Sequence, residues 1–228
     1  MTIKNNNFSK TNYHYKLPLS KRKALRIVET SYLASATSLI WIALYYLPVG
    51  GSIFRLALPL PLILLQIRRG NKAGIEGVTL SVMLLIALMG PLRGPLVLFP
   101  YGFLSLWLGY SWQKGLNWWF SWIVGVFIGT LGFLIRGFVL SALVGENLWV
   151  IITRAGASLI EKGIDIFNLS FYPDMMQVQF VALCLIIAQE IVYVLCLHAL
   201  AYWIFPRLKV SIPEPPALLD SLISLDPL

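Results

Sequence analysis

Two charged residues inside long apolar stretches are the positions best suited to chemistry. Arg136 lies within residues 118–144, and Glu190 lies in the middle of residues 178–205. A charge inside a bilayer is costly unless it is paired or lines a polar cavity. We therefore predict that Arg136 and Glu190 meet inside the protein. Their roles stay open between an architectural ion pair, a ligand or proton pathway, and two independent placements.

A row of glycines supports an inward direction for Arg136. Gly125, Gly129, Gly132 and Arg136 follow one another at spacings of 4, 3 and 4 residues. At about 100° per residue, these positions lie within about 60° of one another on a helix. Glycines on one face allow another helix to approach closely. Arg136 is therefore expected to point into a helix contact and away from lipid.

Two further arginines accompany turns. Arg55 follows the Gly50-Gly51 pair, and Arg93 lies in the Gly-Pro-Leu-Arg-Gly-Pro run of residues 90–95. Guanidinium groups at a low-dielectric mouth can hold a carboxylate or a phosphate in bidentate fashion. The candidate ligand-binding set is therefore Arg55, Arg93, Arg136 and Glu190. The alternative for the two turn arginines is contact with lipid headgroups.

Small residues gather on one face near the start of the first apolar segment. Ser31, Ala34, Ser35 and Ser38 recur at i, i+3, i+4 and i+7. Such a face lets two helix backbones approach closely within a membrane. We expect it either to pack inside the bundle or to dock a helix of a partner protein.

The composition indicates that membrane helices position these residues. Hydrophobic residues make up 58% of the 228 residues and charged residues 12%, whereas a soluble domain carries about 25% charged residues. These values exclude a disordered chain and an ordinary soluble enzyme. The expected fold is all-α, a polytopic bundle of membrane helices.

Six apolar segments approach or reach the length that crosses a bilayer, which is about 20 residues. The second is short and contains Pro59 and Pro61. The predicted spans are residues 31–49, 53–67, 74–89, 96–112, 118–144 and 178–205. The chain thus divides into a basic N-terminal tail over 1–30, a membrane domain over 31–205 and a Pro-containing tail over 206–228.

Residues 147–166 predict a different kind of helix. Their polar residues recur at i, i+4, i+7, i+8 and i+11, and they are Arg154, Ser158, Glu161, Lys162 and Asp165. Each charge at mid-membrane would cost about 2.5–3.5 kcal/mol. We therefore expect an amphipathic helix on the outer surface, with a seventh, partly buried span as the alternative.

The basic residues are distributed unevenly along this topology. The chain has 18 Lys and Arg against 10 Asp and Glu, and seven of the basic residues lie before position 27. With the N-terminus inside, thirteen of the eighteen fall on the cytoplasmic side and five outside, as the positive-inside rule requires. We expect both termini in the cytoplasm, in a multi-pass protein of an inner, plasma or thylakoid-type membrane. The basic tail is either solvated or an amphipathic lipid-surface segment.

The sequence lacks the motifs of several chemistries. It contains no HExxH motif, Walker loop, GxSxG motif or Cys/His metal spacing. Cys184 and Cys196 would lie about 18 Å apart on one helix, too far to bridge each other. We expect no enzyme activity, no metal, no cofactor and no nucleic-acid partner. Membrane lipids are the expected surroundings.

Several runs carry a family resemblance. They are the apolar run from Arg55 to Gly70, Met-Gly-Pro-Leu-Arg-Gly at 89–94, Pro-Tyr-Gly at 100–102, and the tail from Arg207 to Pro216. These runs resemble the YybS-like family of integral membrane proteins of unknown function, in its shorter cyanobacterial-type branch. That family is in turn similar to the S components of energy-coupling-factor transporters, six-helix proteins that capture vitamins.

The resemblance implies a binding function. In S components a small-residue face on the first helix docks a coupling subunit, and Ala34 with Ser38, or Ser31 with Ser35, matches that face with serine in place of one alanine. We expect the protein to bind a small anionic solute or a lipid for uptake or sensing. Its partners would be a transmembrane coupling subunit and ATPases. The alternative is a non-transporting assembly or scaffold protein of another membrane complex.

Overall fold

Helices form the part of the chain that the computed structural model describes, which confirms the all-α fold. The structure describes residues 20–47, 50–145, 147–167, 174–210, 212–213 and 215–216. The predicted N-terminal tail up to residue 19, the end of the first predicted span at 48–49 and most of the C-terminal tail lie outside these ranges.

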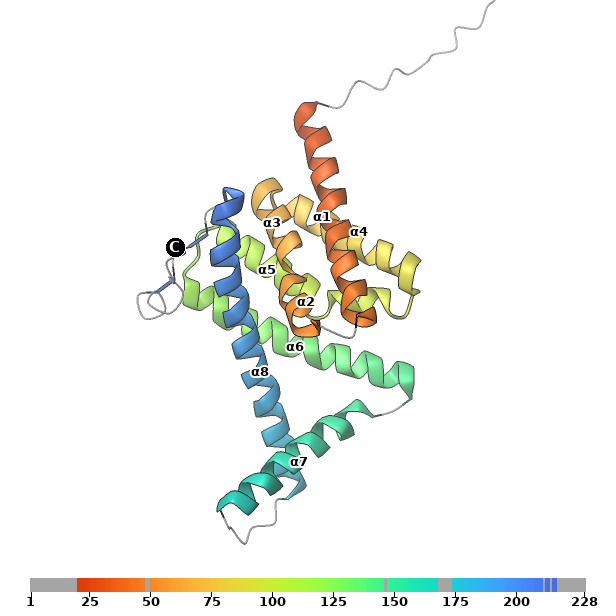
Figure 1. The fold of residues 1–228 in the computed structure, drawn as a ribbon, viewed down its shortest axis with the longest axis vertical. Helices are drawn as coiled ribbons and strands as arrows, with labels where there is room; N and C mark the ends of the chain where they lie inside the picture. The colour runs from red at the N-terminus through yellow and green to blue at the C-terminus, as the bar shows by residue number, and fades with distance from the viewer. Residues whose placement is uncertain are drawn as a thin grey trace, which may run out of the picture.

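The helices follow one another with short connections (Figure 1). The α-helices are α1 (Lys21–Tyr46), α2 (Gly51–Ala57), α3 (Leu60–Arg69), α4 (Asn71–Met89), α5 (Tyr101–Gln113), α6 (Trp118–Val144), α7 (Leu148–Phe167) and α8 (Met175–Ile204), and the 3-10 segments are η1 (Gly94–Leu98) and η2 (Pro206–Leu208).

Local sequence explains where the two longest helices begin and where α6 ends. α8 starts with a capping box, in which the Asp174 side chain accepts from the backbone and the Gln177 side chain accepts from the Asp174 N–H at 3.0 Å. The Asn117 side chain caps the start of α6 by accepting from the Trp119 N–H. α6 ends at Gly145, whose φ of 76° suits a residue without a side chain.

Four of the predicted spans are single long helices. In the described ranges, α1, α4, α6 and α8 are long and apolar enough to cross a membrane. α1 begins at Lys21 rather than at residue 31, because Lys, Arg, Leu and Ala are good helix formers and extend the helix beyond its apolar part. The helix therefore begins before the predicted start of the first span, and the position at which the span itself begins stays a prediction.

The other two predicted spans are broken. Residues 53–67 are divided between α2 and α3 near Pro59, because a proline removes a backbone donor and disfavours helix in the residue before it. Residues 96–112 are divided between η1 and α5, with Pro100 between them. The 13 residues of α5 extend about 20 Å, against a hydrocarbon core of about 30 Å. The count of six spans therefore stays a prediction.

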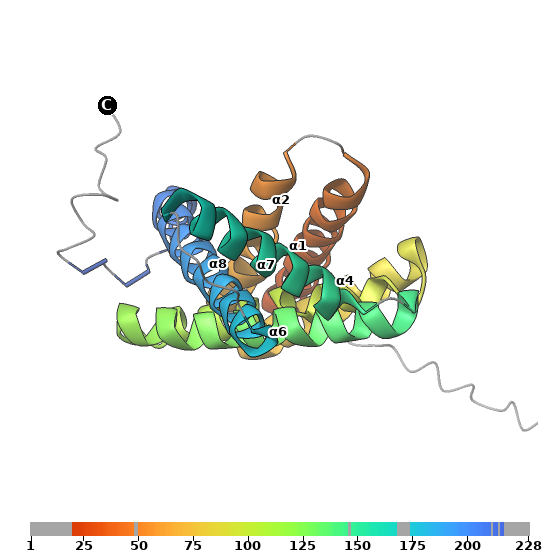
Figure 2. The same cartoon turned by 90° about the horizontal axis from the view of Figure 1, so that it is seen from below.

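The helices pack against one another, and α7 lies at one end of the group. α1 contacts α2, α3 and α4, and α3 contacts α4 and α5. α6 contacts α5 and α8. Figures 1 and 2 show α7 at one end of the molecule, crossing the N-terminal half of α8.

The helix predicted over 147–166 is present as α7. Arg154, Ser158, Glu161 and Lys162 are exposed, whereas Gly156 is buried against α8. A Cβ on Gly156 would lie 3.3 Å from the Val178 carbonyl oxygen, so the two helices cross closely. The polar face is therefore confirmed for these four residues. The side chains of Ala155, Leu159, Asp165 and Ile166 lie outside the description.

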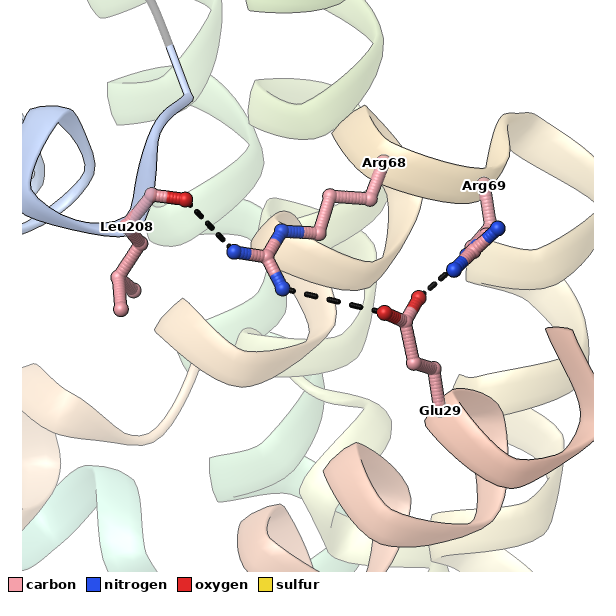
Figure 3. A network of polar contacts seen from close by, with 4 residues as sticks. All are labelled: Glu29, Arg68, Arg69 and Leu208. Carbon is pink, nitrogen blue, oxygen red and sulfur yellow. Dashed lines mark hydrogen bonds and ion pairs between the residues drawn. The ribbon is translucent and has the colours of Figure 1, made fainter. Parts of the chain in front are cut away.

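Charged residues tie together one end of the fold. Glu29 of α1 pairs with Arg69 and, at 3.9 Å, with Arg68, both at the end of α3 (Figure 3). Arg68 also donates to the Leu208 carbonyl of η2 at 2.7 Å. Arg26 of α1 also forms an ion pair with Glu76 of α4. We call these residues the Glu29 cluster; it joins the start of α1, the α3–α4 connection and the segment after α8.

Candidate functional site

Two of the four predicted ligand-binding residues line one cavity. Arg55 of α2 and Arg136 of α6 meet there with Tyr101 of α5, around a volume of about 380 Å³. The rest of the lining is apolar and comes from α1, α6 and α7: Leu44, Phe133, Gly137, Leu140, Ile151 and Ile152. We call this space the arginine cavity.

Tyrosines hold Arg55 in place. Its Nε donates to the Tyr101 hydroxyl at 2.9 Å, and its carbonyl oxygen accepts from the Tyr193 hydroxyl at 3.0 Å. The guanidinium carbon lies 5.9 Å from the centre of the Tyr193 ring. α5 and α8 therefore fix the side chain and the backbone of Arg55 from two directions.

Aromatic residues of α1 and α5 hold Arg136. Its Nη2 donates to the Tyr45 hydroxyl at 3.0 Å. Its guanidinium carbon lies 5.1 Å from the Trp41 ring and 5.9 Å from the Tyr101 ring, within the range of a cation–π interaction. Tyr101 therefore contacts both arginines and links them.

Neither arginine forms an ion pair with a carboxylate in the described part of the chain. The ion pairs found there all belong to the Glu29 cluster. Each guanidinium carries five N–H donors, and Arg55 and Arg136 each make one described side-chain hydrogen bond. Donors and positive charge are therefore left for an anion at the cavity wall.

The predicted contact between Arg136 and Glu190 was wrong. Glu190 of α8 is only 1% exposed, and its Oε2 has no hydrogen-bond partner within the described ranges. That oxygen faces Gly129, where an added Cβ would lie 2.5 Å away. Arg55 is the cation that acts electrostatically on Glu190, without forming an ion pair.

The glycine face on α6 explains this outcome. The expected close approach is present at Gly129, and at Gly132 an added Cβ would lie 2.6 Å from Pro100. The contact partner changes along the face, from α8 at Gly129 to the start of α5 at Gly132. By Arg136 it is α1, so a shared helix face did not imply a shared partner.

Arg93 does not join the site. It precedes η1, it is exposed, and neither described cavity is lined by it. Headgroup contact, the alternative given for this arginine, is the interpretation that fits its exposure.

The predicted docking face is divided between the interior and the surface. Ala34 and Ser38 are buried against α4, where Ser81 donates to the Ala34 carbonyl at 3.2 Å. Ser31 and Ser35 are exposed. Internal packing therefore accounts for Ala34 and Ser38, and only the other two remain open to a partner.

A second buried polar cluster lies near the other end of α6. Ser111 donates to Ser121 at 2.6 Å, the Ser121 hydroxyl lies 3.3 Å from His198 Nε2, and His198 Nδ1 lies 2.8 Å from the Val194 carbonyl. All three side chains are buried, and neither described cavity reaches them. This arrangement joins α5, α6 and α8. The described residues also contain no group of three metal-ligating side chains.

The aromatic partners of the arginines were not identified from the sequence. Tyr101 stood in the Pro-Tyr-Gly run, but a run of three residues does not show which arginine it contacts. Tyr45, Trp41 and Tyr193 look like ordinary interfacial or packing aromatics. Their role depends on contacts between helices that are far apart in the chain.

A family model described as "Predicted membrane protein (DUF2232)" matches residues 35–222, which is most of the chain. No curated protein and no solved structure gives a significant match.

Proposed function

Because the chain belongs to the DUF2232 family of predicted membrane proteins, we propose that it works within a membrane, where the arginine cavity binds a small anionic solute or a lipid. The observation that carries this proposal is that Arg55 and Arg136 line one cavity and that neither forms an ion pair within the described residues. Charges placed within membrane helices are costly unless they are paired or line a polar cavity. A carboxylate or phosphate supplies the missing partner through charge-assisted hydrogen bonds.

The proposed role is binding for uptake or sensing rather than catalysis. The resemblance to the YybS-like family, and through it to S components, supports six spans, a coupling subunit and ATPases as partners. The broken segments α2–α3 and η1–α5 would be the second and fourth spans. Ser31 and Ser35, exposed on α1, are the part of the small face that such a subunit would reach.

We propose that both termini are cytoplasmic and that α7 lies on the outer surface of the membrane. The Glu29 cluster supports a common side for the start of α1 and the segment after α8, since Arg68 reaches both Glu29 and Leu208. Ser158→Cys on the exposed face of α7, in a background without Cys184 and Cys196, should react with a membrane-impermeant maleimide from outside. Labelling from the cytoplasmic side alone would contradict this topology.

Native purification of the full chain tests the function. Mass spectrometry of the purified protein should find a bound anion, and Arg55→Gln and Arg136→Gln should each reduce its amount. Subunits that purify with the protein would show whether it couples to ATPases. Recovery of a stable membrane complex with no bound anion would favour the scaffold alternative.

A further inference from the structure

The arginine cavity continues into a second, apolar cavity. The second space has a volume of about 240 Å³ and shares Phe133, Gly137 and Ile152 with the first. Its remaining lining comes from the C-terminal half of α6 and the start of α7: Leu134, Phe138, Ser141, Asn147 and Trp149. No arginine lines it. The two spaces together have one cationic end and one apolar end.

The apolar end faces the surroundings of the helices. Phe138 lines the second cavity and is 77% exposed, and the neighbouring Leu143 and Val150 are exposed as well. In a membrane, exposed apolar side chains on α6 contact lipid. A ligand can therefore enter sideways from the bilayer between α6 and α7.

We infer that the ligand is an anionic amphiphile, with its carboxylate or phosphate head at Arg55 and Arg136 and its apolar tail between α6 and α7. This inference rests on the proposed function and narrows it. The head matches the cavity in charge, and the tail matches the apolar lining past Phe133. A small hydrophilic anion has no apolar part that could fill the second cavity.

Gly137 offers a precise way to block the tail. It lies at the junction of the two cavities, and a Cβ built on it meets no atom within 4 Å. Gly137→Leu therefore places a side chain at the junction whose Cβ meets no atom, and leucine is a better helix former than glycine. Ala142→Leu is the matched control, because Ala142 lies exposed on the same helix and lines neither cavity.

Photolabelling of the full chain in phosphatidylcholine nanodiscs tests the inference. The probes are palmitate and phosphatidic acid that carry a diazirine in the chain, and the readout is labelling of the peptide spanning residues 133–152. We expect at least one probe to label this peptide. Gly137→Leu and Arg136→Gln should each lower that labelling at least tenfold, whereas Ala142→Leu should not change it. The two probes separate a carboxylate head from a phosphate head.

Competition by short anions separates this inference from the proposed function. Unlabelled palmitate or phosphatidic acid should compete at least tenfold better than acetate or inorganic phosphate. If Gly137→Leu leaves labelling unchanged while acetate or phosphate binds in an Arg136-dependent way, the amphiphile is wrong and the anion site stands. If neither Arg55→Gln nor Arg136→Gln changes the binding of any probe, both proposals fail.

Discussion

Arginines in two regions of this protein have different contact partners. In the Glu29 cluster, Arg68 and Arg69 share one carboxylate, and Arg26 pairs with Glu76. At the arginine cavity, Arg55 and Arg136 meet tyrosine hydroxyls and aromatic rings. The same residue type therefore joins helices where it forms ion pairs with an acid, and leaves hydrogen-bond donors available where its described contacts are hydroxyls and rings.

The ion pair at the Glu29 cluster favours the charged form of Arg69. The pKa of Arg69, which follows the apolar part of α3, is raised because its guanidinium donates a hydrogen bond to Glu29. An anion that approached Arg68 and Arg69 would have to compete with Glu29 for their guanidinium groups. The comparison thus predicts that the two regions respond differently to substitution, in stability at one and in binding at the other.

The largest effect on stability is expected where α6 is packed, beside the cavity rather than in it. Gly132→Ala places a Cβ 2.6 Å from Pro100, so we expect a loss of about 1–3 kcal/mol in the free energy of unfolding. Gly137→Ala, five residues further along α6, meets nothing within 4 Å and should be neutral or stabilising. Unfolding in detergent by titration with SDS measures both. Equal losses for the two variants would show that the cavity at Gly137 is not open.

A smaller effect is expected from breaking the Glu29 cluster. Glu29→Gln removes the carboxylate that Arg68 and Arg69 share, and partly exposed pairs of this kind contribute about 0.2–1 kcal/mol. The same SDS titration should detect this loss at low salt and a smaller one at high salt. Anion binding should not change. Glu161→Gln, on the exposed face of α7, is the matched control and should alter neither quantity.

The smallest effect is expected from the pair that the sequence suggested. Arg136 and Glu190 make no ion pair, so Arg136→Met and Glu190→Leu should act independently on stability. In a double-mutant cycle we expect a coupling energy below about 0.5 kcal/mol. A coupling of 2 kcal/mol or more, on the order of a broken buried pair, would mean that the two residues meet in the membrane.

The periodicity of the sequence predicted the helices better than it predicted their contacts. The 147–166 pattern gave α7 to within a residue at each end, because a polar face repeats at the helical period. The breaks at Pro59 and Pro100 were visible as prolines, yet hydropathy alone counted each segment as one span. The average hydropathy of a segment does not show that a proline within it breaks the helix.

The site was predicted in part for a similar reason. Arginines within and beside apolar segments are visible in the sequence, and two of the three proposed ones, Arg55 and Arg136, lie at the cavity. Arg93 has the same local signature and lies exposed, because its position depends on how η1 packs. The aromatic residues that hold the arginines come from other helices. Contacts of this kind depend on the tertiary arrangement and not on spacing along the chain.

Anion retention in matched arginine variants tests whether Arg55 and Arg136 bind the anion. The full chain and two double variants, Arg55→Gln with Arg136→Gln and Arg68→Gln with Arg69→Gln, are purified in parallel, and the bound anion is quantified by mass spectrometry. Each charge-assisted hydrogen bond contributes about 1.5–3 kcal/mol, and 1.4 kcal/mol corresponds to about tenfold in affinity. We expect at least a tenfold loss of anion from the Arg55 and Arg136 variant and full retention by the Arg68 and Arg69 variant. Full retention by the Arg55 and Arg136 variant, in folded protein, would contradict binding at these two arginines.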